Sequence, residues 1–320
     1  MSDKTSRQVE AIRTFSRYYT NILGLLNQHI LESDLSLSEV RVLHEIDKCE
    51  NCTSAALAGI LCLDPGYLSR TLKHFEQSGL LIRQPSPDDR RAYLLRLTDE
   101  GKQVIAQLNG RSDRQIEQLI APLSIRERAE LVKDLTSAKT IWTRGQELRP
   151  EDVTIRTELK PGDAGSITAM HGRLYQEEYG YSLAFEGYVA ASFSEFLLQY
   201  DPARDHLWCA EHDGNIVGCI GIVGHGDRAQ LRWFLVDPLY RGLGLGRRLL
   251  TAAMDFVRQC SEYRSIYLDT TSDLHQAIGL YERLGFQKVK ETPNPLWREG
   301  LMELEYSMEL APSPAAEQAE

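Results

Sequence analysis

Residues 229–252 constrain the fold of this chain more than any other stretch, because an apolar strand, a glycine-rich turn and a helix follow one another without a break. Residues 231–236 are apolar apart from Arg232 and end at Asp237-Pro238, which predicts a buried strand. The turn has the sequence Arg-Gly-Leu-Gly-Leu-Gly at 241–246. An amphipathic helix is predicted to follow, with its apolar side made by Leu249, Ala253, Phe256 and Val257.

A glycine turn between a strand and a helix directs backbone N–H groups and the helix dipole at one anion. A Walker loop would end in Gly-Lys-Ser/Thr, but Gly246 is followed by two arginines. A dinucleotide fingerprint needs a third glycine where Arg247 stands, and it follows the first strand of a βαβ unit. The pattern Arg-x-x-Gly-x-Gly at 241–246 instead resembles the acetyl-CoA pyrophosphate loop of the GNAT family of N-acetyltransferases.

The length of 320 residues predicts two domains, since single cores rarely grow beyond about 250–300 residues. Residues 1–149 hold nearly equal numbers of basic and acidic side chains, so almost all of the net charge of −10 belongs to the remainder. The N-terminal half can therefore carry a local DNA-binding face. No apolar run approaches the ~20 residues of a membrane span. With no signal-peptide core and six scattered cysteines, we expect a cytoplasmic protein without a membrane partner.

Four helices are predicted in the first 80 residues. Apolar spacing indicates an amphipathic helix over 6–33 and a second over 37–46, capped by Ser36 or Ser38. Thr53 caps a short helix with Leu57 and Ile60 inside. Asp64-Pro65 begins a helix that Gly79 ends, with its inward side made by Leu68, Leu72 and Phe75.

Two strands at 80–83 and 93–97 are joined by a charged turn, and Thr98 caps a long helix. Helices followed by a basic hairpin describe a winged helix-turn-helix. The pattern Gly79-Leu80-Leu81-x-Arg83, then Asp88-Asp89-Arg90-Arg91 and Leu97-Thr98-x-x-Gly101, resembles the wing of the MarR family of transcriptional regulators over residues 1–145.

The MarR resemblance implies partners for this half. It implies that double-stranded DNA meets the helix after Asp64 through Tyr67, Ser69, Arg70 and Lys73, and the wing through Arg83, Arg90 and Arg91. It also implies a homodimer, formed by the first helix and segments 113–121 and 124–142, that binds a pseudo-palindromic operator. Cys49-x-x-Cys52, with Cys62 nearby, lacks the second pair of a zinc site; redox sensing and burial as small apolar side chains both remain open.

The C-terminal half predicts the order β-α-α-β-β-β-α-β-α-β-β over residues 151–310, which matches the GNAT fold. A second motif, Ala277-x-x-Leu280-Tyr281-Glu282-x-x-Gly285-Phe286, resembles the helix and strand that close the GNAT active site. The predicted fold class is therefore a mainly α winged helix-turn-helix followed by an α/β mixed-sheet acetyltransferase. The predicted domains are 1–145, a linker at 146–150, 151–310 and a disordered tail at 311–320.

The GNAT resemblance implies direct attack of a small amine on the thioester of acetyl-CoA, without a metal. It implies that Tyr281 is the general acid, whereas the candidate bases in this chain are Glu177, Glu178 and Asp269, acting alone or through water. The residues expected to hold the coenzyme are Leu235, Val236, Arg241, Gly242, Leu243, Gly244, Leu245, Gly246, Arg247 and Arg248, the first two through backbone amides at the acetyl carbonyl. The residues expected to line the acceptor pocket are Tyr175, Glu177, Tyr179, Tyr181 and Trp233.

Two departures from the family pattern leave the activity open. Many members have a glutamate on the strand at 230–235, where this chain has none, and an asparagine seven residues before the tyrosine, where Leu274 stands. The preferred interpretation is a regulator fused to a small-amine acetyltransferase. The alternative is a repressor whose second domain only senses acetyl-CoA or an amine; acetylation of a protein is a further option.

Overall fold

The computed structural model describes residues 3–25, 30–85 and 93–310, and it divides the chain into two compact units, Met1–Arg128 and Ala129–Glu320. The boundary falls inside helix α6 (Ile125–Thr143). The domain limits that the sequence predicts, with a linker at 146–150, stay a prediction. The tail at 311–320 and the wing tip with Arg90 and Arg91 lie outside the described residues. No helix in the described part of the chain is long and apolar enough to cross a membrane.

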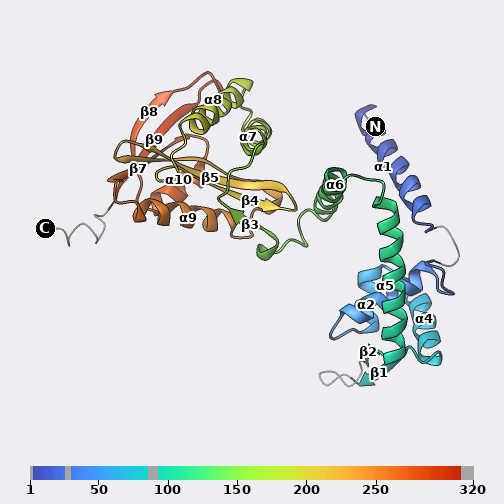
Figure 1. Ribbon diagram of the computed structural model, residues 1–320. Helices are drawn as coiled ribbons and strands as arrows, with labels where there is room; N and C mark the ends of the chain where they lie inside the picture. Colours follow the sequence, from blue (N-terminus) through green and yellow to red (C-terminus); the bar gives the residue numbers. More distant parts are fainter. Residues whose placement is uncertain (1–2, 26–29, 86–92, 311–320) are drawn as a thin grey trace. The chain divides into compact units, whose positions relative to one another are not determined.

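The first unit is helical apart from one hairpin (Figure 1). Its elements are α1 (Asp3–Ile22), α2 (Leu37–Lys48), α3 (Ser54–Leu61), α4 (Pro65–Gln77), β1 (Leu81–Pro85), β2 (Tyr93–Leu97) and α5 (Asp99–Ile120). The antiparallel pair β1–β2 has Leu81 opposite Leu97. Helices α2 to α5 and the hairpin enclose one core, in which Leu68, Leu72 and Phe75 are buried as predicted.

The predicted helix starts in this unit are confirmed. Ser36 and Glu39 form a reciprocal capping box at α2, with the Ser36 N–H donating to Glu39 Oε2 over 2.8 Å. Asp64 Oδ1 accepts from the Tyr67 N–H at 2.8 Å, ahead of Pro65 in the first turn of α4. The side chains of Thr53 and Thr98 cap α3 and α5. Such caps satisfy N–H groups that have no partner inside the helix.

Two sequence predictions for this unit are wrong. The first helix ends at Ile22, because the chain turns at Gly24 with φ +63°, and Ile30 packs into the core from outside any helix. Ile60 is 56% exposed, since the short helix α3 buries only its Leu57 side. Segment 113–121, expected at the dimer interface, forms the last turns of α5, up to Ile120.

The second unit is built on a seven-stranded sheet in the order β3-β4-β5-β6-β7-β9-β8 (Figure 1). Its strands are β3 (Thr154–Arg156), β4 (His206–His212), β5 (Asn215–His225), β6 (Arg228–Val236), β7 (Ser265–Thr271), β8 (Gln287–Pro293) and β9 (Met302–Glu309). All neighbouring strands are antiparallel except β6 and β7. The predicted strand and helix order is confirmed.

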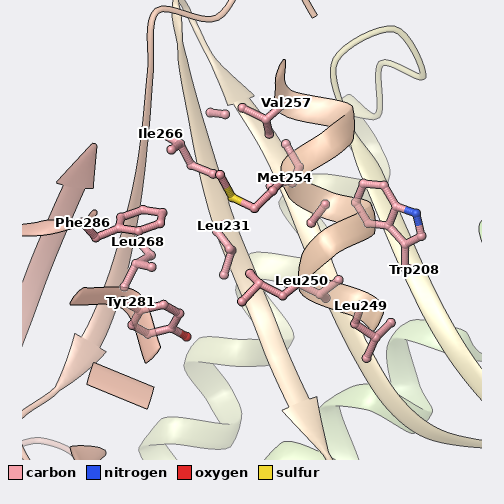
Figure 2. Packing of buried hydrophobic residues seen from close by; sticks show 14 of the residues in the cluster. Trp208, Leu231, Leu249, Leu250, Met254, Val257, Ile266, Leu268, Tyr281 and Phe286 are labelled. Atoms are coloured by element: carbon pink, nitrogen blue, oxygen red, sulfur yellow. The ribbon is translucent and has the colours of Figure 1, made fainter. Parts of the chain in front are cut away.

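Helices cover the two faces of this sheet with two separate cores. On one face α9 (Leu245–Gln259) and α10 (His275–Arg283) pack against β6, β7 and β9, and Figure 2 shows Leu249, Leu250 and Met254 of α9 directed at the strands. On the other face, α7 (Asp163–Tyr179) and α8 (Leu183–Gln199) enclose the second core with the inward residues of β4 and β5.

Strands β6 and β7 part halfway along β6. The parallel ladder joins residues 228–231 to 265–268 only, although β6 continues to Val236. The register with β5 also shifts between Cys219 and Gly221, and Trp233 has φ +51°. Gly221 is required here, because a Cβ would lie 2.6 Å from Trp233 Cε3. Residues 232–236 therefore leave one edge of β6 without a neighbouring strand.

Candidate active site

A cavity of about 990 Å³ opens where β6 and β7 part. It is lined by the C-terminal turns of α7, the second half of β6, the glycine turn, the end of β7, α10 and Trp297. Of the residues that the sequence predicted, the cavity lining contains Tyr175, Glu178, Tyr179, Tyr181, Trp233, Leu235, Val236, Arg241, Gly242, Gly244, Leu245, Gly246, Arg247, Asp269 and Tyr281. Glu177, Leu243 and Arg248 do not line it.

The glycine turn leaves a run of backbone donors open. Gly242 and Gly244 have φ values of +87° and +72°, which side-chain-bearing residues rarely adopt, and no atom lies within 4 Å of a Cβ built at either. Gly244 is the N-cap of α9, and the first intrahelical bond runs from the Arg248 N–H to Gly244 O at 3.1 Å. The N–H groups of residues 245–247 come before the first intrahelical bond, so they have no acceptor within the helix. They lie at its N-terminus, the positive end of the helix dipole, beside the cavity.

The three arginines of the turn have different surroundings. The Arg241 guanidinium binds both carboxylate oxygens of Glu178, at 2.8 and 3.0 Å, and donates through Nε to Val236 O. Arg247 is exposed at the cavity. Arg248 points elsewhere, because its guanidinium donates to the carbonyl oxygens of Pro150 (2.9 Å) and Val153 (3.2 Å). Arg248 therefore fixes the chain before β3 to α9.

The free edge of β6 presents a backbone donor to the cavity. Asp237 N–H donates to Val217 O on the β5 side at 2.9 Å. Since successive N–H groups of a strand point to opposite edges, the Val236 N–H is directed toward the open edge. Leu235 and Val236 lie opposite Cys219 and Gly218 of β5, and the same alternation directs the Leu235 N–H toward β5. Between these two residues, Val236 is thus the better placed to bind an oxygen in the cavity.

Tyr281 lies on α10. It belongs to the buried core and also lines the cavity. It is 6% exposed, and its ring meets Phe286 edge-on with centroids 6.0 Å apart. In Figure 2 the hydroxyl points away from Phe286. This hydroxyl has no hydrogen bond within the part of the chain that the structure describes. Burial raises its pKa, so the phenol keeps its proton at neutral pH.

Two of the three candidate bases line the cavity, and they differ in availability. Glu178 lies in the last turn of α7 and is held by Arg241. Asp269 on β7 accepts one hydrogen bond, from Gln230 Nε2 at 2.8 Å. Burial and then the charge of Glu305 raise the pKa of Asp269 above its ordinary value. A carboxylate with a raised pKa is the more effective proton acceptor.

Glu303 on β9 is a second carboxylate at this end of the cavity, and sequence reasoning missed it. Asn294 Nδ2 donates to it at 3.2 Å. Burial raises its pKa, and the charge of Asp269 raises it further. The β7–β9 pairing explains the proximity, because Glu303 and Glu305 lie opposite Thr271 and Asp269 on one face of the sheet.

Aromatic side chains make the opposite wall. Tyr175 contacts Tyr179, Tyr181 and Phe185 with ring centroids 4.4–5.6 Å apart. The Tyr181 hydroxyl binds Thr271 Oγ1 (2.6 Å) and Asp273 Oδ1 (2.9 Å), which joins α7 to the end of β7. Burial raises the pKa of Tyr175 and of Tyr181. Trp233 lines the cavity but stacks on Phe193 at 4.0 Å, so it is mainly a core residue.

The loop between β8 and β9 closes this wall from a distant part of the sequence. Trp297 is 6% exposed and meets Phe185 and Tyr188 with centroids 5.1 and 5.0 Å away. Arg298 fixes the loop through an ion pair with Asp273 at 2.9 Å and a hydrogen bond to Tyr179 O at 2.7 Å. The sequence contains no local pattern that places Trp297 here.

The position that often holds asparagine in the resembled family is occupied by Leu274, at the start of α10. Leu274 is the N-cap of α10 and makes no side-chain cap bond. Replacing a polar cap by an apolar residue costs about 1 kcal/mol, so α10 starts without that support. Gln230, at the start of the strand without a glutamate, is 7% exposed and bridges His225 (3.1 Å) and Asp269 (2.8 Å).

In the first unit, α4 carries the predicted DNA-facing side chains on its uncovered side. Ser69, Arg70 and Lys73 are exposed and Tyr67 is partly exposed, whereas the opposite side of the helix is buried. Arg83 forms an ion pair with Glu76 of α4 at 3.1 Å instead of standing free. Cys52 belongs to the core, and burial raises the pKa of its thiol to about 12, while Cys62 is exposed.

Known families match both units. A model of the Acetyltransferase (GNAT) family matches residues 172–286, and a model of the MarR family matches residues 35–93. The uncharacterized N-acetyltransferase YjgM of Escherichia coli is 33% identical over 123 residues, which are 37% of this chain and 72% of YjgM. The multiple antibiotic resistance protein MarR of Salmonella typhimurium is 31% identical over 114 residues, 35% of this chain and 71% of that protein.

Among solved structures, an acetyltransferase from Streptococcus agalactiae is 22% identical with a TM-score of 0.40, covering 50% of this chain and 99% of that one. The split sheet with its glycine turn and the winged helical unit define a DNA-binding regulator joined to an acetyltransferase domain. The chain belongs to the MarR family through its N-terminal half and to the GNAT family through its C-terminal half. Both predicted families and the predicted fold class are thus confirmed.

Proposed function

We propose that this protein is a transcriptional regulator and an acetyl-CoA-dependent N-acetyltransferase that acts on a small amine. One observation carries the enzymatic part: the glycine turn, the free edge of β6, Tyr281 and Asp269 all line one cavity. These are the parts that acetyl transfer requires, namely an anion cradle, a donor for the carbonyl oxygen, a general acid and a general base.

The residues at the cavity fit the coenzyme. The open space above Gly242 and Gly244 admits a pyrophosphate against the backbone, and the N–H groups of residues 245–247 are its donors. Arg247 and Arg241 supply positive charge; Arg241 keeps its orientation through Glu178. Three residues expected at the site do not line the cavity, so we assign them no contact with acetyl-CoA or the acceptor: Glu177, Leu243 and Arg248.

The chain's own groups carry the protons of the reaction. When bound, acetyl-CoA supplies the thioester carbon with which the amine nitrogen forms a bond as the carbon–sulfur bond breaks. Asp269 takes the proton that the acceptor nitrogen loses, directly or through water. The Val236 N–H binds the carbonyl oxygen as it gains negative charge. Tyr281 donates its hydroxyl proton to the departing thiolate and regains one from solvent.

Gly244→Glu tests the cradle. A side chain at φ +72° strains the turn, and a carboxylate opposes pyrophosphate at the same place. We expect acetyl-CoA affinity, measured by calorimetry, to fall about 10- to 50-fold, which corresponds to roughly 1.4–2.3 kcal/mol. Gly226→Glu is the matched control, because Gly226 also has a positive φ and open space but lies in the β5–β6 turn. Equal losses in both variants would remove the cradle from the account.

The N-terminal unit binds DNA through α4. The exposed side of this helix bears Ser69, Arg70 and Lys73, and Arg70 Nη1 reaches to 3.6 Å from a Cβ built at Gly66, one turn earlier. The α4 side chains enter the major groove, and Arg83, Arg90 and Arg91 of the wing contact the backbone or the minor groove.

Arg70→Ala with Lys73→Ala tests the DNA interface. Losing one base or phosphate contact costs about 1–3 kcal/mol, so we expect the affinity for the operator, measured by fluorescence anisotropy, to fall at least about 10-fold. Arg258→Ala, at an exposed arginine of α9 outside the proposed dimer interface, should leave DNA affinity unchanged. Wild-type affinity in the double variant would contradict this interface.

The regulator acts as a homodimer on a pseudo-palindromic operator. Uncovered apolar side chains support this on both helices expected at the interface: Ile12 and Phe15 of α1 are 52% and 47% exposed, and Leu135 and Trp142 of α6 are 42% and 70% exposed. Two α4 helices related by a twofold axis would address two half-sites.

A specific contact favours the second candidate function, a non-catalytic acetyl-CoA sensor. Within the second unit, Ser137 of α6 accepts a hydrogen bond from Asn215 Nδ2 at 3.2 Å. A Cβ at Gly145, just beyond α6, would lie 2.5 Å from Leu239 O of the 3₁₀ turn η2 (Pro238–Tyr240). Because η2 leads directly into the glycine turn, ligand binding can act on the helix in which the boundary to the DNA-binding unit falls.

A further inference from the structure

The polar face of β6, β7 and β9 has a charge pattern that the transfer chemistry alone does not explain. Side chains at 230 and 232 of β6, 269 of β7 and 303 of β9 all line the cavity. Asp269 and Glu303 provide negative charge for an ammonium group, whereas Arg232 places a cation in the same pocket. A simple amine has no anionic group that could pair with the Arg232 guanidinium.

Arg232 is held in place but not neutralised. One guanidinium nitrogen lies 3.2 Å from the Tyr188 hydroxyl, and the guanidinium carbon lies 5.9 Å from the Tyr188 ring and 5.1 Å from the Trp233 ring. No Asp or Glu oxygen of the described chain comes within 4.0 Å of its nitrogens. Its strand neighbour Arg228 differs, since it pairs with Glu305 at 2.9 Å and does not line the cavity.

The position of Arg232 relative to the carboxylates follows from the sheet. Leu231 is opposite Leu268 in the last pair of the β6–β7 ladder, so Arg232 and Asp269 are the next residues along the two strands as they part. The charge of Arg232 lowers the pKa of Asp269, against the larger effects of burial and Glu305, which raise it. A cation and two carboxylates therefore border the same part of the cavity, beside the aromatic wall of Phe185, Tyr188 and Trp297.

We propose that the acceptor is an amino acid, whose amino group lies at Asp269 and Glu303, whose carboxylate pairs with Arg232, and whose side chain packs on the aromatic wall. This inference rests on the proposed function and names its substrate class. A planar guanidinium forms charge-assisted hydrogen bonds to a carboxylate. A site that pairs with such a group favours it over an analogue that lacks it, because the guanidinium is then left without its carboxylate partner.

Matched pairs of acceptors test the inference with the full-length protein and acetyl-CoA. The pairs are L-phenylalanine with phenethylamine, L-leucine with isoamylamine and L-lysine with cadaverine; the members of each pair differ only by the carboxylate. Release of free thiol gives kcat and KM for each compound. We expect the amino acid of at least one pair to have a kcat/KM at least about 10-fold above its decarboxylated partner.

Arg232→Gln tests whether Arg232 causes the preference for amino acids over amines that lack the carboxylate. We expect KM for the preferred amino acid to rise about 10-fold or more, and kcat/KM for the matching amine to change much less. Arg228→Gln is the control on the same strand and should change neither. If amines without a carboxylate are used as well as amino acids, or if Arg232→Gln weakens both members of a pair equally, the inference is wrong while the acetyltransferase itself stands.

Calorimetric titration of the same compounds into the protein with saturating coenzyme A keeps the two proposals separate. Amino-acid binding that is lost in Arg232→Gln, without thiol release from any compound, would uphold the amino-acid site and overturn catalysis. Absence of both binding and thiol release would overturn the amino-acid site together with the enzyme.

Discussion

Replacing Tyr281 by phenylalanine should lower kcat about 100-fold or more and leave acetyl-CoA affinity unchanged. The substitution removes only the hydroxyl group, and general acid catalysis raises a rate by a factor of about 10²–10⁴. The ring stays in place because its packing against Phe286 and the α10 core does not involve the hydroxyl. Since no other group of the described chain bonds this hydroxyl, its loss leaves no partner unsatisfied. Single-turnover thiol release and calorimetry measure the two quantities.

Tyr306→Phe is the matched control for this prediction. Tyr306 lies in the same core, is 4% exposed and donates to Glu282 at 3.3 Å, but it does not line the cavity. Its variant should retain wild-type kcat. Full turnover by Tyr281→Phe, or an equal loss in the two variants, would show that Tyr281 is only a packed aromatic residue.

Asp269→Asn is expected to have the second large effect, a loss of about 100-fold in kcat/KM for the acceptor. The base must be unprotonated to work, and its pKa is raised by burial and by Glu305. Activity of the wild type should therefore fall with decreasing pH through a carboxyl ionisation above the ordinary value of 3.8. The asparagine variant should lose this dependence, because its side chain does not ionise.

Glu178→Gln distinguishes the two candidate bases that line the cavity. Glu178 orients Arg241, so its replacement should raise KM for acetyl-CoA and leave the acidic side of the pH profile intact. The reverse pattern, with an unchanged profile in Asp269→Asn and a lost one in Glu178→Gln, would assign the base to Glu178.

The sequence predicted most of the fold because the relevant information is local. Ser36, Asp64 and Thr98 begin helices through bonds to residues three positions away, and the glycine turn follows its strand directly. The failures have a local cause as well. Apolar residues at helical spacing continue to Ile30, and nothing in that spacing reveals that the chain turns at Gly24.

Residues that belong to compact motifs could be placed at the cavity from the sequence, whereas residues that strand pairing and a distant loop bring there could not. Tyr281 and the 241–247 turn belong to compact motifs, whereas the acceptor end combines β6, β7, β9 and the β8–β9 loop. Glu303 joins Asp269 only through strand pairing, and Trp297 reaches the wall through a loop held by Arg298. Arg248 looked like a phosphate ligand from its spacing, but it bonds the backbone before β3. Tertiary pairing of this kind has no signature in one sequence.

Thiol release from acetyl-CoA, measured on the full-length protein across amino acids, polyamines and amine antibiotics, tests the central claim most directly. We expect release that depends on the acceptor and is lost in Tyr281→Phe. No release with any acceptor, together with acetyl-CoA binding by calorimetry, would contradict the claim and identify the second unit as a sensor.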